Sequence, residues 1–436
     1  MAEKFVLDNA LIVNDGQRFY GHVVIDGPII AAVNEGRYEG DIADVRDMNG
    51  NLLIPGVIDT HVHFREPGLT HKADIYTESR AAAAGGVTSY FDMPNCKPMT
   101  VTAEALEEKN RIADKNSAVN RAFYIGANSQ NIDVLRSTDY SRVPGVKVFL
   151  GQSTGNMQLS GNENLDAVFS LPQIISVHSE DQGIIDANMQ RAREKYGDEI
   201  PVSCHPEIRS AEACLKCTTE AVERARRLGT HLHICHITTE EELQFLDASK
   251  PVEEKKITGE ACVQHLWFTD EDYPRLGTRI KCNPAVKGRR HREALLRAVA
   301  DGRIDVVSTD HAPHTLAEKE GGIKGASGIP LIQYSLQAML DLSREGHFPL
   351  EKVVEVMCHN PTRLFGIEKR GYIRPGYYAD LAIVDLNRPH AVTREDILSK
   401  CGWSPFEGHT FTSTVTATYV NGAAPGVNPM PLRFIR

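Results

Sequence analysis

The run NLLIPGVIDTHVHFREPGLTHKAD, residues 51–74, joins an apolar stretch to a segment rich in polar side chains. Its centre, VIDTHVH (57–63), has the composition of a buried strand. Side chains two positions apart lie on one face of a strand, so His61, His63 and Arg65 project together if the strand continues that far. Two adjacent imidazoles are a natural pair of metal ligands, although an isolated pair of histidines also arises by chance. The choice depends on what lies at the ends of the other strands.

Further β-rich runs follow, separated by helical stretches such as AEALEEKNRIADKN. The predicted strands are 57–63, 88–93, 121–127, 146–151, 174–179, 231–237, 257–263 and 305–311. Strands that alternate with helices pair in parallel, and eight such units are what a (β/α)8 barrel needs. The two ends of the chain instead carry short strands with turn signals. We therefore expect an α/β protein with a TIM-type barrel over 55–366 and a small β-sandwich domain built from 1–54 and 367–436.

The bulk composition is that of a globular protein: 436 residues, 41% hydrophobic and 24% charged. No apolar run reaches the ~20 residues that cross a bilayer, and the start of the chain does not resemble a signal peptide, so we expect a cytoplasmic location. The net charge of -10 argues against nucleic acid and anionic membranes as partners. The nine cysteines are expected to be reduced thiols, with Cys214 and Cys217 as ordinary helix residues.

Polar side chains recur at or near the C-terminal ends of the predicted strands. They are His61, His63, Asn95, Lys147, His178, His236 and Asp310. Barrel enzymes build their active sites at this end, so we predict a metal centre there. Strand alternation places His233 and His236 on opposite faces, and we expect His236 to be the ligand while His231 and His233 face outward.

Lys147 lies inside a predicted buried strand, GVKVFLG, where a lysine is costly unless it is paired or neutral. One interpretation is a buried salt bridge with an acidic side chain. The other is that the neutral amine adds CO2 to form a carbamate, an anionic ligand with two oxygen atoms. Each oxygen could then hold one metal ion of a pair, and the carbamate would add negative charge among the histidines.

These motifs together resemble the dihydroorotases of the amidohydrolase superfamily. The resemblance covers nearly the whole chain and rests on PGVIDTHVHFREPGLTHKAD, AAAAGGVTSYFDMPNCKP, the strand lysine, two later histidines and STDHAPHTLAEK. It implies two zinc ions, bridged by a carbamylated Lys147. It further implies that His61, His63 and Asp310 hold one of these ions. His178 and His236 would hold the other.

The resemblance also implies contacts to a substrate. Arg65 and Asn95 would bind the α-carboxylate of dihydroorotate, with help from His314. The further implied contacts are Asn283, Ser327 and Gly328. Because Asn95 and Asn283 are each closely followed by proline, turn formation is the alternative role for both.

The segment after Lys147, residues 151–158, reads GQSTGNMQ and is polar with two glycines. In some dihydroorotases, the loop at this point carries hydroxyl residues that fold over the substrate. Ser153 and Thr154 stand at the matching distance from the lysine, so the resemblance predicts a lid here. The alternative is an ordinary connection between a strand and a helix.

The implied reaction is the zinc-dependent, reversible cyclisation of N-carbamoyl-L-aspartate to L-dihydroorotate in pyrimidine (UMP) synthesis, with Asp310 as ligand and general acid/base. One alternative is an allantoinase or a hydantoinase/dihydropyrimidinase, which shares the metal residues but has no need of Arg65. A more remote alternative is a non-catalytic scaffold with the same fold. The expected partner is a small-molecule substrate. A homodimer and an association with aspartate carbamoyltransferase, which some relatives form, both stay open.

Overall fold

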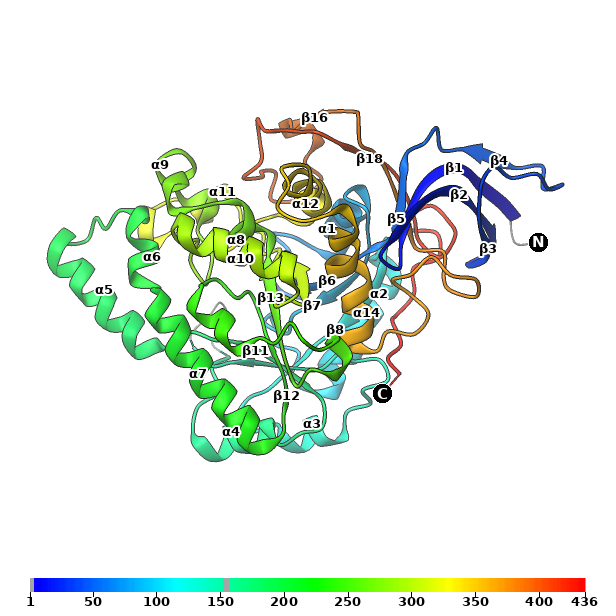
Figure 1. Ribbon diagram of the computed structural model, residues 1–436. Helices are drawn as coiled ribbons and strands as arrows, with labels where there is room; N and C mark the ends of the chain where they lie inside the picture. The colour runs from blue at the N-terminus through cyan, green and yellow to red at the C-terminus, as the bar shows by residue number, and fades with distance from the viewer. Residues whose placement is uncertain (1–3, 152–156, 436) are drawn as a thin grey trace.

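The computed structural model describes residues 4–151 and 157–435 (Figure 1). Its centre consists of parallel strands that follow one another in chain order, as two ladders, β6-β7-β8 and β9 to β14. The strands are β6 Val57–Val62, β7 Val87–Asp92, β8 Asn120–Phe123, β9 Ile125–Gly126, β10 Val146–Phe149, β11 Ile174–His178, β12 His231–Ile234, β13 Ile257–Cys262 and β14 Val306–Ser308. All eight predicted strand regions are present, although 121–127 is divided at Tyr124 into β8 and β9.

Helices lie between these strands, as the alternating sequence pattern predicted, and further helices follow β14. They are α1 Ile75–Ala84, α2 Ala103–Asn116, α3 Ile132–Ser137, α4 Asn162–Phe169, α5 Gln182–Tyr196, α6 His205–Ile208, α7 Ala211–Leu228, α8 Val263–Trp267, α9 Tyr273–Leu276, α10 Arg289–Asp301, α11 Leu316–Lys319, α12 Ser335–Arg344, α13 Leu350–Val354 and α14 Asn360–Phe365. Side-chain caps begin several of them: Asp74 accepts from the Thr77 amide at α1, and Thr102 from the Ala105 amide at α2. Cys214 and Cys217 are buried residues of α7, and every cysteine is unpaired, as predicted.

The first and last parallel strands lie next to each other. A parallel bridge pairs Val62 with His311, and the His63 amide donates to the His311 carbonyl at 2.7 Å. Beside this bridge, the Thr309 hydroxyl donates to Asp59 at 2.6 Å. The end of β6 and the segment after β14 are therefore held together, although they lie far apart in the sequence.

Both ends of the chain contribute to one seven-stranded sheet, ordered β18-β15-β5-β1-β2-β3 with β4 paired to β1. Its strands are β1 Lys4–Asn14, β2 Gln17–Asp26, β3 Ile29–Glu35, β4 Val45–Asp47, β5 Leu52–Pro55, β15 Leu381–Asp385 and β18 Thr414–Tyr419. A separate pair joins β16 His390–Ala391 to β17 Thr410–Phe411. The β-rich unit expected from both termini is present, while its sandwich form and its limits stay predictions.

Alternation along β15 attaches this sheet to the central strands. Leu381 and Ile383 pack into a core shared with β1 and β2, whereas Ala382 and Val384 belong to the main core of the central strands. A strand that is buried on both faces reads as a continuous apolar run, as residues 381–384 of β15 do. Within the described residues, no helix has the length and apolar character needed to cross a membrane.

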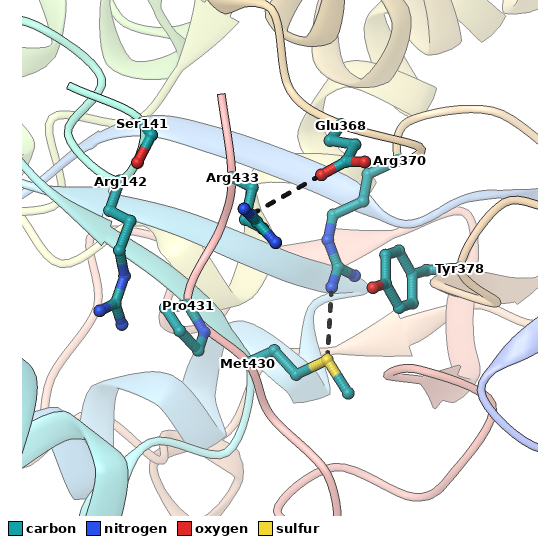
Figure 2. A pocket seen from close by; sticks show the side chains of 8 residues that line it. All are labelled: Ser141, Arg142, Glu368, Arg370, Tyr378, Met430, Pro431 and Arg433. Carbon is teal, nitrogen blue, oxygen red and sulfur yellow. Dashed lines mark hydrogen bonds and ion pairs between the residues drawn. The ribbon is translucent and has the colours of Figure 1, made fainter. Parts of the chain in front are cut away.

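The C-terminal tail completes the attachment at a pocket shown in Figure 2. At this pocket the Arg370 guanidinium donates to Asp380 and to Asn421 and lies 4.0 Å over the Tyr378 ring. Asp380 also accepts from the Asn120 side chain at 3.1 Å, so it links β8 to the terminal segments. Arg370 and Asp380 are each 3% exposed, and their pairing is therefore protected from solvent.

Replacing Arg370 by methionine should destabilise the fold by about 3 kcal/mol, because Asp380 would keep a buried charge without its cation. Urea unfolding followed by circular dichroism measures the change. The exposed neighbour Lys369 supplies the control, since Lys369→Met removes a charge without uncovering a buried one. Equal unfolding midpoints for the two variants would show that the Arg370–Asp380 pair does not stabilise this junction.

Candidate metal centre and substrate pocket

The six side chains predicted as metal ligands come from five of the central strands or the residues just after them. They are His61 in β6, His63 directly after it, Lys147 in β10, His178 at the end of β11, His236 after β12 and Asp310 after β14. None is more than 9% exposed. Buried polar groups in this number need hydrogen-bond or metal partners, which must come from one another or from a ligand.

One group of three converges on Asp310. Its Oδ1 lies 3.3 Å from His61 Nε2 and 3.0 Å from His63 Nε2. The potential ligand atoms of these three residues all lie within 4.8 Å of one another. Two imidazole nitrogens and a carboxylate oxygen are a donor set that suits Zn2+. The residues present therefore fit a metal ion at this point.

The second predicted pair also meets. His178 Nδ1 lies 2.9 Å from His236 Nε2, and the His236 ring lies 5.4 Å from the His61 ring, centroid to centroid. Lys147 is 1% exposed, and its Nζ lies 3.0 Å from Cys235 Sγ. Within residues 4–151 and 157–435 Lys147 makes no ion pair with an acidic side chain, so the structure gives the salt-bridge interpretation of this lysine no support.

Backbone conformation aims several of these groups. Asp310, His236 and Arg65 have φ values of 48°, 39° and 67°, in the left-handed region that side-chain-bearing residues rarely adopt. Such residues concentrate at functional sites, where the surrounding structure holds them. In each case the residue follows a strand, and the reversed φ turns its side chain away from the strand's regular alternation.

A pocket lies beside this centre and contains most of the predicted substrate residues. Its lining comprises His63, Arg65, Asn95, Asn283, Asp310, Ala312, Ser327 and Gly328. Asn283 Oδ1 is buried and has no hydrogen-bond partner among the described residues, so it is available to a donor on a ligand. Gly328 has a φ of 146°, and an added Cβ would lie 2.4 Å from the Ala312 carbonyl oxygen. Only glycine fits this wall of the pocket.

Arg65 gives the pocket a buried positive charge. It is 4% exposed, its Nε donates to the Pro313 carbonyl at 3.0 Å, and burial lowers its pKa to about 10. Its guanidinium makes no ion pair within the part of the chain that the structure describes. A buried cation without an ion-pair partner favours an anionic ligand, and the planar guanidinium matches a carboxylate.

Residues 52–424 match the profile of the Amidohydrolase family. The chain belongs to the amidohydrolase family. It is 38% identical over 361 residues to a dihydroorotase of Halobacterium salinarum, which covers 82% of each chain. It is 32% identical over 436 residues to an allantoinase of Bacillus velezensis, covering 97% of this chain and 94% of that protein.

Among solved structures, the L-hydantoinase (dihydropyrimidinase) from Arthrobacter aurescens matches with a TM-score of 0.91 and 25% identity, over 99% of this chain and 98% of that one. Dihydropyrimidinase from Brevibacillus agri matches with a TM-score of 0.88 at 22% identity. These neighbours imply a TIM-barrel fold with a β-rich domain. The chain is a metal-dependent cyclic amidohydrolase.

The amidohydrolase site contains a carboxylate that the sequence patterns did not single out, Glu260 in β13. Its Oε1 lies 2.7 Å from His61 Nδ1 and also accepts from the His236 amide at 3.2 Å. Burial alone would raise its pKa, but His61 and His233 hold the pKa of Glu260 well below its usual range. Because Glu260 accepts a hydrogen bond from the Nδ1–H of His61, the Nε2 atom of His61 is left to face Asp310 and a metal ion.

Glu180, which the sequence patterns also did not single out, lies beside His178 of the second pair. Its Oε2 lies 3.1 Å from His178 Nε2 and accepts from Arg209. Arg209 and His178 hold the pKa of Glu180 at about 2 against the effect of burial. With Nε2 facing the Glu180 carboxylate, His178 presents Nδ1 towards His236. Both glutamates lie within or just after predicted strands, and that position was the only signal available in the sequence.

The expectation that strand alternation separates His233 from His236 is wrong. His233 Nε2 lies 3.7 Å from Glu260 Oε2, and the His236 amide donates to the same carboxylate. Strand β12 ends at Ile234, and the left-handed conformation of His236 cancels the alternation that a longer strand would impose. Of the remaining predicted residues, Ser153 and Thr154 lie outside the described residues, so the lid stays a prediction.

Removing the carboxylate of Glu260 should weaken metal binding by about 10- to 100-fold, the range seen when a partner of a ligating histidine is lost. Chelator competition on purified Glu260→Ala measures this directly. Glu260→Gln keeps an acceptor oxygen for His61 and should lose less affinity. If Glu260→Ala binds metal as tightly as the unmodified protein, the glutamate does not orient His61.

Proposed function

We propose that this amidohydrolase is a dihydroorotase, which interconverts N-carbamoyl-L-aspartate and L-dihydroorotate in pyrimidine synthesis. The observation that carries the proposal is the buried Arg65 guanidinium, which lines the pocket next to Asp310 and makes no ion pair with any residue that the structure describes. Dihydroorotate carries a carboxylate on its ring, whereas hydantoin and allantoin do not. A carboxylate supplies the missing counter-charge, with Asn95 and His314 close by.

The proposed cofactors are two zinc ions. His61, His63 and Asp310 would hold one ion, and His178 and His236 the other. A carbamate on Lys147 would bridge them. The position of Lys147 supports this role, because the side chain is 1% exposed and makes no ion pair with an acidic side chain among the described residues. When bound, the metal ions would lower the pKa of water and polarise the amide carbonyl of the ring.

The remaining chemistry falls to side chains of this chain. Arg65 and Asn95 would orient the ring through its carboxylate, and Asn283 Oδ1 would accept a ring N–H. In the hydrolytic direction Asp310 would take a proton from water at a carboxylate oxygen and pass it to the departing ring nitrogen. Burial raises the pKa of Asp310, which brings this carboxylate closer to the range useful for proton transfer.

The proposal also includes the form of the two domains, their limits and the location of the enzyme. The two parallel ladders would form a single eight-stranded barrel, with domain limits near 55 and 366, and the terminal sheet would be part of a β-sandwich. The enzyme would act in the cytoplasm on small molecules. An allantoinase or hydantoinase is the second candidate, because an allantoinase relative matches over 97% of the chain and hydantoinases share the fold.

Purified protein should hydrolyse L-dihydroorotate with a kcat/KM at least about 100-fold above those for hydantoin and allantoin, since only dihydroorotate pairs with Arg65. The three substrates are assayed side by side with the same metal-loaded preparation. Arg65→Met should remove most of this preference, mainly by raising KM for dihydroorotate. A preference of the unmodified enzyme for either neutral ring would exclude dihydroorotase and favour the second candidate.

Lys147→Ala should lower the metal content and remove most activity, because one anionic bridge between two cations is lost. Elemental analysis and the dihydroorotate assay measure the two effects, and an added short carboxylic acid should restore part of both. The exposed Lys250 provides a control, since Lys250→Ala removes a lysine far from any predicted ligand in the chain. Full metal content and full activity in Lys147→Ala would exclude the carbamate.

A further inference from the structure

His314, at the edge of the pocket, has a polar neighbour on each ring nitrogen. Its Nδ1 lies 3.0 Å from Lys72 Nζ, and its Nε2 lies 3.1 Å from both the Ser327 carbonyl oxygen and Arg65 Nη2. The ring is 2% exposed, and burial together with the charges of Arg65 and Lys72 lowers the pKa of His314 far below its ordinary value. A neutral imidazole has one N–H group, so its tautomer decides which neighbours it can bond.

Lys72 determines that tautomer. An ammonium group only donates, so Nδ1 of His314 must accept from it and the ring proton must sit on Nε2. The Ser327 carbonyl, which only accepts, agrees with this assignment. Burial lowers the pKa of Lys72, but Glu318 opposes this shift, since its Oε1 lies 2.9 Å from Lys72 Nζ. Despite burial, Lys72 and the Thr315 amide lower the pKa of Glu318 to about 2.

The position of the ring is fixed independently of Lys72. The Trp403 indole donates to the His314 carbonyl at 2.7 Å, and a Cβ added to Gly328 would lie 2.9 Å from His314 Cδ2. Because the backbone and the ring face are held by these contacts, the specific contribution of Lys72 is the location of the imidazole proton.

We propose that Lys72 is a positioning residue that fixes His314 as an N–H donor and thereby makes the pocket selective for a carboxylate. With its proton on Nε2, His314 cannot accept from the Arg65 Nη2 that lies 3.1 Å away. The Nε2–H of His314, which donates to the Ser327 carbonyl, and Arg65 Nη2 then lie side by side as two donors, and an anionic oxygen that enters can accept from both. In the other tautomer Nε2 would accept from Arg65 and repel a carboxylate oxygen. The inference rests on the proposed dihydroorotase function.

Lys72→Met should raise KM for dihydroorotate at least about tenfold while kcat falls less than about threefold, because a binding contact is lost and the reacting groups stay in place. Lys72→Arg, which can still donate to Nδ1, should recover most of the loss. Lys97 is the matched control: it is exposed and close enough to act on Lys72 electrostatically, so Lys97→Met removes a nearby cation without touching His314.

Nitrogen NMR of 15N-histidine-labelled protein provides a second readout that a merely structural role would not change. The His314 signals, assigned by their loss in His314→Gln, should show a protonated Nε2 and an unprotonated Nδ1. In Lys72→Met, Nδ1 loses the donor from which it must accept while Arg65 still faces Nε2, so a protonated Nδ1 should become detectable. A protonated Nδ1 in the unmodified protein, or an unchanged KM in Lys72→Met, would overturn the inference. Failure of the unmodified enzyme to act on dihydroorotate would instead overturn the proposed function, and the NMR result would still report the tautomer.

Discussion

The join between the first and last parallel strands is the constraint on which the candidate metal centre depends. The Val62–His311 bridge and the hydrogen bond from Thr309 to Asp59 connect segments 250 residues apart in the chain. They bring the Asp310 carboxylate against the imidazoles of His61 and His63. Asp59 is buried where it makes this hydrogen bond, and burial raises its pKa to about 7. Without this join, His61, His63 and Asp310 would not form a group of three donors, and the pocket beside them would not exist.

Buried carboxylates then give each imidazole a direction. Glu260 accepts a hydrogen bond from His61 Nδ1, and Glu180 Oε2 lies 3.1 Å from His178 Nε2, so the opposite nitrogens face the centre. The same logic operates at the pocket, where Lys72 occupies His314 Nδ1. A partner on one ring nitrogen decides which tautomer the imidazole adopts. It therefore also decides whether the other nitrogen can bind a metal ion or donate to a substrate. The chain has a net charge of -10, and the positive charge that a carboxylate substrate needs is supplied locally by Arg65 and its neighbours.

The sequence was most informative where a periodic pattern and a strand end coincide. Alternation of strands and helices predicted the parallel ladders, and the turn-rich ends predicted a sheet built from both termini. His61, His63 and Asp310 could be placed together because all three lie at or just after the C-terminal ends of predicted parallel strands. Glu260 could not, since a single glutamate in a strand reads like any half-exposed position until its neighbours are known. The side-chain direction of His236 could not be predicted from strand alternation. The end of β12 and the positive φ of His236 both depend on tertiary contacts.

The central claim is that the converging strand ends hold metal ions beside a guanidinium that selects a carboxylate substrate. A crystal structure with N-carbamoyl-L-aspartate, using anomalous scattering at the zinc edge, tests both halves at once. The account predicts one peak among His61, His63 and Asp310, a second beside His178 and His236, and the α-carboxylate of the ligand on Arg65. Peaks at other side chains, or a ligand carboxylate that avoids Arg65, would contradict it.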